Sequence, residues 1–346
     1  MENEENRVID TNAQASALGW DFQSSLALFF VVDDIKNLES VKVEGKTEDI
    51  ELVYNNGSTI FVQAKSQLDP YNSNTTNLHL KNGLKTLINT SQENEYTYLI
   101  YGTNINNPFV YREFVSLFAG NPTNYSFKEL PKKIQDKIIK NANSVAKNEK
   151  LSLKNFDYNR LRILTLPFYG EEDKTRYRFI KEKILSFLDA IGLTGTQADR
   201  IFNSFLLDFT KNASKSISLQ KEDLAWTIII FTLDVRNDEF FDEFDLGIAE
   251  EDAIENIYGS FIEQKSLDFS LLNEVGGHFK ELDKLGMFDS NRAAPREFIN
   301  ITVAYYEKKI FFEELDQLTP SVTKYILWKI LKKRRTIERL SREVGI

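Results

Sequence analysis

Hydrophobic and polar residues alternate along residues 49–54 and 59–65, and an Asn-Gly turn at 56–57 separates the two segments. A period of two on both sides of such a turn predicts a β-hairpin. Side chains two positions apart on a strand lie on the same face, so Gln63 and Lys65 are expected to share one. Asp49, on the neighbouring strand, is expected to meet them at one point.

The segments around this hairpin predict further elements. Apolar residues recur at helical spacing over 19–30 and again over 77–89. Residues 95–101 are typical of a buried strand. With a strand before Glu44, the predicted order is helix, three strands, helix, strand.

The rest of the chain is expected to be mainly helical. Residues 161–168 are short and apolar, which indicates a late strand at the edge of the sheet. From Asp173 onward the pattern is helical, and Ser218 is expected to cap a helix. The acidic stretch at 234–252 is the predicted domain boundary. Other helices are predicted over 111–119, 130–147, 253–262, 273–285, 294–314 and 322–340.

Composition restricts the class of protein. A chain of 346 residues with 42% hydrophobic residues has room for about two globular domains. The absence of cysteine excludes disulfides, thiolate metal sites and a cysteine nucleophile, and it fits a cytoplasmic protein. The acidic N-terminus is unlike a signal peptide, and no uninterrupted apolar run approaches the length of a membrane span. The two histidines, His79 and His278, are expected to be surface or partly buried imidazoles.

The formal net charge of −9 is unfavourable for a protein that binds nucleic acid, but the charges are unevenly distributed. Basic residues gather at 132–154, at 160–178 and in the terminal helix at 329–342. An acidic total is therefore compatible with a local basic groove. The alternative for each basic run is a solvated face without a ligand.

Asp49, Gln63 and Lys65 are the candidate chemical groups. Mg²⁺ prefers oxygen ligands and keeps several waters, so one or two carboxylates and a carbonyl oxygen are enough to hold it. Asp49 and Gln63 are the predicted ligands, with Glu44 or Glu48 adding a second negative charge and Mn²⁺ as an alternative ion. Lys65 is predicted to orient or deprotonate a water that attacks a phosphodiester. The competing interpretation is a polar surface hairpin.

The element order resembles the core of the PD-(D/E)xK nucleases, and more specifically the effector endonucleases of bacterial anti-phage defence systems, including CBASS effector nucleases and the Lamassu nuclease subunit. The resemblance is carried by Gly19, Phe22 and Gln23, by residues 44–50, and by residues 62–66. It implies an α/β restriction-endonuclease-like core (helix, three-stranded meander, helix, strand) followed by an all-α C-terminal region. Gln23 is implied to support the site, because the family's first helix lies against the sheet.

One residue departs from the family pattern. Gln63 stands where many members carry glutamate, which leaves the metal site one charge short. Some restriction-type relatives tolerate glutamine there, so the resemblance still implies an active enzyme.

On this basis three regions are expected. Residues 8–170 form the PD-(D/E)xK nuclease core, 171–235 a helical extension of it, and 245–346 an α-helical oligomerisation or partner-docking domain. The implied activity is Mg²⁺-dependent cutting of double-stranded DNA with little sequence specificity. The implied partners are double-stranded DNA, further copies of the chain in a homo-oligomer, and an SMC-like or ring-type ATPase of a defence system.

Two other functions remain open: a non-catalytic DNA- or ATPase-binding module with a degenerate nuclease fold, and a restriction-type endonuclease. A nucleotide-binding P-loop ending at Gly45-Lys46-Thr47 is excluded. Ser40 stands where the first glycine of that motif is required, and the motif should precede a helix, whereas a strand is expected here.

Overall fold

The computed structural model describes residues 5–45, 48–193, 195–213, 215, 217–233, 238–266, 268–312 and 315–345. Contacts between Cα atoms divide the chain into two compact units. The first comprises Met1–Ala190 and Thr194–Leu224 with Gly345, and the second Ile191–Leu193 and Ala225–Val344 with the terminal residue. Part of the acidic stretch predicted as a boundary, residues 234–237, lies outside the described residues.

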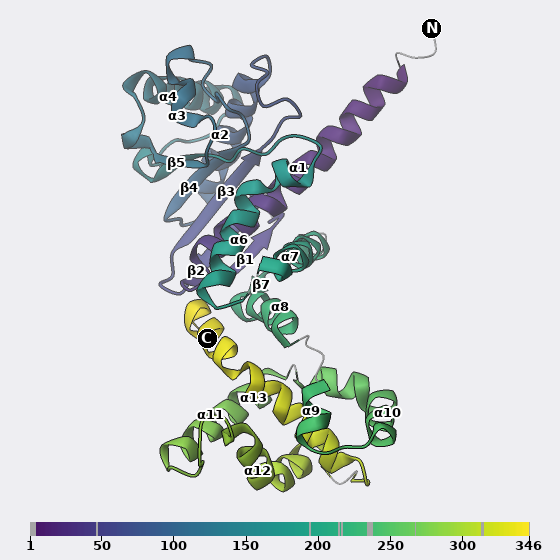
Figure 1. The fold of residues 1–346 in the computed structure, drawn as a ribbon. Helices are drawn as coiled ribbons and strands as arrows, with labels where there is room; N and C mark the ends of the chain where they lie inside the picture. Colours follow the sequence, from purple (N-terminus) through teal and green to yellow (C-terminus); the bar gives the residue numbers. More distant parts are fainter. Residues whose placement is uncertain are drawn as a thin grey trace. The chain divides into compact units, whose positions relative to one another are not determined.

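A seven-stranded mixed sheet forms the centre of the first unit, in the order β5-β6-β4-β3-β2-β1-β7 (Figure 1). Strands β1, β2 and β3 form an antiparallel meander, and β4 and β6 then run parallel to β3. The strands are β1 (Leu38–Val43), β2 (Ile50–Tyr54), β3 (Thr59–Lys65), β4 (Tyr98–Thr103), β5 (Thr123–Ser126), β6 (Leu161–Thr165) and β7 (Leu219–Gln220).

The β2–β3 hairpin is present as the alternation predicts. Ile50 pairs with Val62 and Leu52 with Ile60. Gly57 closes the turn at φ +78°, a left-handed conformation that glycine adopts without a steric penalty. The amide of Tyr54 donates to the carbonyl of Ser58 at 2.9 Å. This register fixes which side chains of β2 and β3 face each other.

Two details of the sheet differ from the sequence-based expectations. The strand predicted at 161–168 exists as β6, but its edge position is wrong, because β5 pairs with its outer side. The helix expected from Ser218 begins only at Lys221, since Leu219 and Gln220 pair with β1 as β7. Both unpredicted strands are short, four and two residues, and neither gives a readable alternation.

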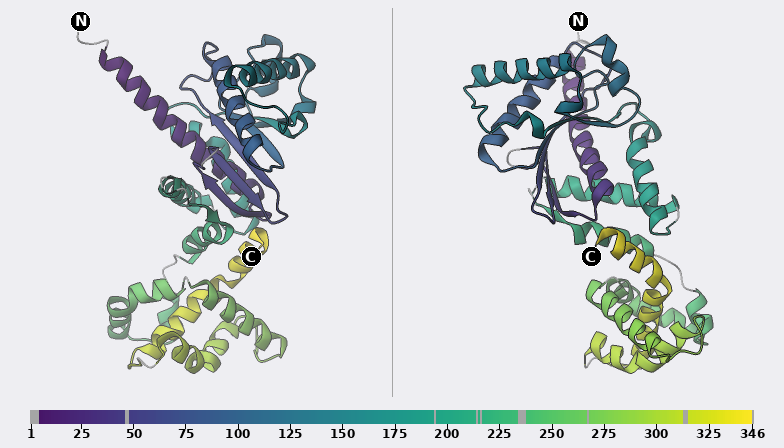
Figure 2. Two further views of the ribbon diagram at one scale, coloured as in Figure 1. Left: turned by 180° about the vertical axis from the view of Figure 1, so that it is seen from behind. Right: turned by 90° about the vertical axis from the view of Figure 1, so that its left-hand side faces the viewer.

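Helices cover both faces of this sheet (Figure 2). On one face, α2 (Thr76–Glu93) and α4 (Lys132–Glu149) pack on apolar side chains of β3, β4 and β6, including Phe61, Tyr101 and Ile163. On the other lies α1 (Glu5–Asp34), whose Leu26 contacts the backbone at Gly102, with α6 (Arg178–Ala190) and α7 (Ala198–Ala213) against it. The remaining short helices are η1 (Arg112–Phe114), α3 (Val115–Phe118), η2 (Phe127–Glu129), η3 (Tyr158–Arg160), α5 (Asp173–Arg176) and η4 (Gly195–Gln197).

Part of α1 is apolar enough to resemble a membrane span. Residues 13–34 meet the length and hydropathy of such a segment, the one instance among the residues that the structure describes. Over half of the most apolar window, 56%, is buried inside the protein, and its residues Phe22, Leu26 and Val31 are fully buried. These contacts identify a core helix that packs under the sheet.

The second unit is helical throughout its described part. Helix α8 (Lys221–Leu233) crosses the division, and α9 (Asp238–Glu243), α10 (Ile248–Ser266), α11 (Phe269–Lys284), α12 (Ala294–Phe311) and α13 (Thr319–Val344) follow. The four long helices correspond to the segments predicted from periodicity, whereas α9 was not predicted. Helix α13 contacts α10, α11 and α12, so it forms the centre of the unit. Phe240 of α9 stacks on Tyr325 of α13 at 4.6 Å between ring centroids.

A substitution at Gly83 of α2 would test how closely this helix packs on the sheet. A Cβ atom at this position would lie 2.5 Å from ring carbons of the fully buried Tyr101. We expect Gly83→Ala to lower the free energy of unfolding by about 1–3 kcal/mol, because a rigid neighbour must move. Urea denaturation followed by circular dichroism measures this change.

Gly19→Ala in α1 is the matched control, since nothing lies within 4 Å of the position that its methyl group would take. This substitution is expected to be neutral or to stabilise the helix by roughly 0.5–1 kcal/mol. Equal effects of the two substitutions would contradict the packing described for α2.

Candidate active site

The residues singled out from the sequence come from three adjacent strand ends. Glu44 directly follows β1, Asp49 directly precedes β2, and Gln63 and Lys65 lie at the end of β3. The amide of Glu44 donates to the carbonyl of Asp49 at 2.7 Å, which closes the connection between β1 and β2. Glu44 itself has φ +56°, a left-handed conformation that is uncommon for a residue with a side chain.

The Asp49 carboxylate ties β2 to β3 through its side chain. Its Oδ2 accepts hydrogen bonds from the Gln63 side-chain amide and from the backbone amide of Ala64, the latter at 2.8 Å. Burial raises the pKa of Asp49, while the charge of Lys65 and these hydrogen bonds act in the opposite direction. Gln63 is only 2% exposed. The structure therefore brings Asp49, Gln63 and Lys65 together.

Glu48 is a second buried carboxylate beside Asp49. It is 4% exposed, and its Oε1 accepts a hydrogen bond from the Thr90 hydroxyl of α2 at 2.5 Å. Burial raises the pKa of Glu48 to about 8, with the Thr90 hydrogen bond opposing the shift and the Asp49 charge adding to it. At neutral pH its carboxyl group is therefore largely protonated until a cation or another positive charge approaches.

Glu44 and Gln23 complete the group. Burial and the nearby Asp49 raise the pKa of Glu44, whereas a hydrogen bond with Gln23 and the Lys65 charge lower it. Gln23 also hydrogen-bonds Asp49 and thereby lowers its pKa. Gln23 of α1 thus reaches two carboxylates at the strand ends.

Lys65 is the positive charge common to all three carboxylates. Its charge lowers the pKa values of Asp49, Glu44 and Glu48. In the described part of the chain, its amine forms no hydrogen bond or ion pair within bonding distance. The same charge contributes to a lowered pKa of His79 on α2, for which burial is the larger cause. A neutral imidazole therefore lies in the electrostatic range of this site.

The donor set fits a hard divalent cation. Two buried oxygen atoms, Oε1 of Gln23 and Oε2 of Glu48, have no hydrogen-bond partner among the described residues. A buried polar atom without a partner is costly, so each of these oxygens is a candidate contact for a cation or another ligand. All the candidate ligand atoms are oxygens, the type preferred by Mg²⁺ and Mn²⁺.

The same geometry limits how such an ion is held. No group of three or more His, Cys, Asp or Glu side chains in the described ranges is arranged to bind a metal. An ion here would depend on Asp49, on amide or main-chain oxygens, and on retained waters, which Mg²⁺ accepts. The Gln63 amide presents its nitrogen to Asp49, so it must turn to offer its oxygen to an ion.

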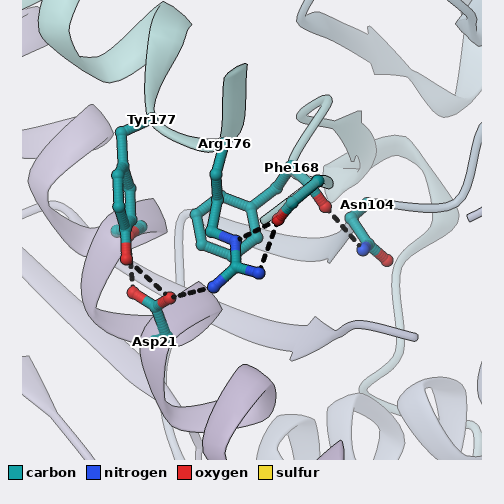
Figure 3. A network of polar contacts seen from close by, with 7 residues as sticks. Asp21, Asn104, Phe168, Arg176 and Tyr177 are labelled. Atoms are coloured by element: carbon teal, nitrogen blue, oxygen red, sulfur yellow. Dashed lines mark hydrogen bonds and ion pairs between the residues drawn. The ribbon is translucent and has the colours of Figure 1, made fainter. Parts of the chain in front are cut away.

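A polar network fixes two of the segments that carry the site (Figure 3). Asp21 of α1 accepts a hydrogen bond from the Tyr177 hydroxyl at 2.8 Å and pairs with Arg176 at 3.5 Å. Asp21 lies two residues before Gln23, so this anchor holds the helix that carries Gln23. Burial raises the pKa of Asp21 despite these partners.

Asn104 fixes the segment after Lys65. It follows β4, and its side-chain amide donates to the carbonyl of Phe168 at 2.9 Å (Figure 3). The same amide donates to the carbonyl of Gln67 at 2.9 Å. Its side-chain oxygen accepts from the Gln67 amide at 2.9 Å. The chain ends after β3, β4 and β6 are thereby joined. A cavity of about 690 Å³ lies beside this network, lined by residues that include Asp21, Leu68 and Arg176.

Thr90, His79, Asp21 and Asn104 were not identified from the sequence as part of this region. Thr90 and His79 lie on α2, Asp21 lies on α1, and Asn104 directly follows β4, all outside residues 44–65. The helical pattern at 77–89 located α2 but gave no indication that Thr90 would meet Glu48. Only the packing of α1 and α2 on the sheet reveals these contacts.

Among known proteins, similarity was found only to solved structures, and it extends over part of the chain. No protein-family model and no curated protein sequence matches the chain. The Cap4 SAVED/CARF-domain containing receptor of Acinetobacter baumannii with the cyclic trinucleotide 2'3'3'-cAAA is 11% identical, with a TM-score of 0.38 over 61% of this chain and 44% of that one. The Cap4 SAVED/CARF-domain containing receptor of Moraxella osloensis is 14% identical, with a TM-score of 0.38 over 62% and 47%.

The matched part of this chain thus covers less than two thirds of the receptor chains. A TM-score of 0.38 is too low to establish a shared fold, so the similarity carries no argument about function.

Glu48 gives the site a measurable pH signature. Its pKa rises from the usual 4.5 to about 8 in the folded protein. Between these values the folded state binds more protons than the unfolded state, so this contribution to stability is lost as the pH rises. Relative to Glu48→Gln, the parent is expected to lose roughly 1–4 kcal/mol of unfolding free energy between pH 5 and 9.

Urea denaturation of both proteins across this pH range provides the test. Glutamine keeps an oxygen that accepts from Thr90, so the comparison isolates the titration. Parallel stability curves for parent and variant would show that Glu48 is not held with a raised pKa.

Proposed function

We propose that this chain is a metal-dependent endonuclease that cuts duplex DNA. The observation that supports it is the position of the Asp49 carboxylate, which accepts from Gln63 and Ala64 of β3 and lies within electrostatic range of Lys65. Burial raises the pKa of Asp49, and a bound cation would favour its charged form. A phosphodiester is proposed as the substrate because the sequence resembles the PD-(D/E)xK nuclease family.

The proposed roles follow from the contacts. Asp49 holds the ion, with its position fixed by Ala64 and Gln63. Gln23 positions the carboxylates of Asp49 and Glu44. Lys65 orients the attacking water or takes its proton. A bound Mg²⁺ ion would polarise the phosphate and stabilise the charge that develops on its oxygens.

The finer parts of the proposal rest on the sequence resemblance. They are the role as effector subunit of an anti-phage defence complex, weak sequence specificity, and activation by a partner ATPase or by homo-oligomerisation. These remain predictions, as does the expectation that residues 245–346 form the docking or oligomerisation domain.

A non-catalytic DNA-binding module is the second candidate. The observation in its favour is that the described residues contain no closed cluster of metal-binding side chains. A binding module would hold DNA equally well in EDTA and in Mg²⁺ and would release no product in either. The cation dependence of product formation separates the two functions.

Lys65→Ala is the decisive substitution for activity. We expect it to lower the rate of Mg²⁺-dependent nicking of supercoiled plasmid by roughly 10²–10⁴-fold, because a group that moves a proton is lost. Lys128→Ala, which removes an exposed lysine of η2, is the matched control and should cut at the parental rate. The assay includes the product of any adjacent ATPase gene, so that an unactivated enzyme is not scored as inactive.

Equal cutting by the parent and Lys65→Ala would remove Lys65 from the mechanism. Cutting by the parent in EDTA would remove the metal from the proposal.

Metal binding has a readout that is independent of activity. Mg²⁺ that binds only the folded state at 100 times its Kd adds about 2.7 kcal/mol of stability, which raises the thermal midpoint. We expect Asp49→Asn to abolish most of this shift, because the charged ligand is lost. Asp136→Asn, at an exposed carboxylate of α4, is the control and should retain it. The same Mg²⁺-induced shift in parent and Asp49→Asn would place the ion elsewhere.

A further inference from the structure

The second unit contains a cavity of about 980 Å³ that the proposed nuclease site does not use. It lies between α9, the turn that leads into α12, and the middle of α13. Five cationic side chains line it: Arg292, Arg296, Lys332, Arg334 and Arg335. We call this cavity the basic cleft. Its three cations from α13 belong to the basic terminal run noted in the sequence.

Carboxylates from α9 neutralise only part of this charge. Glu239 pairs with Lys332 at 3.1 Å, and Glu243 pairs with Arg296 at 3.7 Å. Asp242 is the third carboxylate in the lining. Arg292, Arg334 and Arg335 form no ion pair with the described residues, although Glu338 and Asp283 lie within electrostatic range of Arg334.

Mutual repulsion accompanies this clustering. Arg334 packs over the Phe279 ring at 4.6 Å and donates to the Leu331 carbonyl at 3.2 Å. Burial lowers the pKa of Arg334, and the neighbouring charge of Arg335 lowers it further. Like charges held close together in one cavity favour the binding of an anion.

A helix end and one indole add to the positive lining of the cleft. The first turn of the 18-residue helix α12 borders it. The amides of Ala293 and Ala294 donate to Ser290 and Pro295 has no N–H, so this helix end contributes mainly through its dipole, which attracts negative charge. Trp328 also lines the cleft, is 3% exposed, and has no hydrogen-bond partner for its indole N–H among the described residues.

We propose that the basic cleft binds the phosphate backbone of duplex DNA. Arg292, Lys332 and Arg335 are exposed, and a single exposed ion pair contributes little. A small anion gains few such contacts. A polyanion contacts several cations at once and releases condensed counterions, which makes the same exposed residues effective. The chain would then hold its substrate outside the metal site, which explains how a protein of net charge −9 binds DNA.

This inference extends the proposed function, but its test is separate because binding needs no metal. A fluorescein-labelled duplex of about three helical turns is titrated with the full chain in EDTA, and fluorescence anisotropy is recorded at several salt concentrations. Because binding is measured without a metal ion, a failure of the nuclease proposal does not affect this measurement.

The decisive variant replaces Arg292 and Arg335 by alanine. With about 0.9 counterions released per phosphate contact, losing two contacts lowers the slope of log affinity against log salt by about 1.8. This corresponds to roughly 10–100-fold weaker binding at about 0.1 M salt. Arg335→Lys keeps the charge and should bind nearly as the parent does, while Lys333→Ala, on α13 outside the lining, should leave the slope within about 1 of the parental value.

Two results would overturn the proposal. One is an unchanged affinity and salt slope in the double variant, whose fold is verified by circular dichroism. The other is found with ATP as a probe at matched ionic strength: if the double substitution weakens ATP binding but not duplex binding, the cleft is a site for small anions.

Discussion

The register between β2 and β3 is the constraint on which the candidate site depends. The tight turn at Gly57 pairs Ile50 with Val62, and the same pairing places Asp49 beside Gln63 and Ala64. A shift of one residue would send every side chain of one strand to the opposite face. Apolar residues of β3 and β4 under α2 and α4 oppose such a shift, since it would expose them. The core thus holds the polar group in place.

The buried polar residues at the candidate site in turn lower the stability of the fold. Glu48 and Asp49 are carboxyl groups in largely buried surroundings, and burial is the main cause of their raised pKa values. A sequence selected for stability alone would place apolar or uncharged residues there. The packed sheet around the site and local hydrogen-bond partners such as Thr90 offset this loss of stability. Carboxyl groups with pKa values perturbed by burial occur more often at functional sites than elsewhere, which agrees with the role proposed for Asp49.

The second unit is organised around one helix with two uses. The inner residues of α13, including Tyr325, Ile326 and Trp328, lie in the helical core, where Phe240 of α9 stacks on Tyr325 and packs at a tilt against Trp328. Its basic residues Lys332, Arg334 and Arg335 line the cleft beside α12. Because the core fixes the helix, the cations are presented at defined positions, which favours contact with a regularly charged ligand.

The sequence by itself determined the local elements with strong periodicity: the β2–β3 hairpin, α1, α2, α4 and the long helices of the second unit. These elements depend on interactions between near neighbours, and a period of two or of 3.6 records them directly. It also indicated that Asp49, Gln63 and Lys65 should meet, because a hairpin of known register relates residues only a few positions apart.

Tertiary structure alone decided the rest. The edge role of β5, the pairing of β7 with β1, and the contact of Thr90 with Glu48 join residues distant in the chain, and no local pattern encodes them. The same holds for the raised pKa of Glu48, which arises from burial between the sheet and α2. The basic run of the terminal helix was visible in the sequence. Its meeting with Arg292 in one cavity depends on the packing of α12 against α13, because side chains of separate helices converge only when those helices pack.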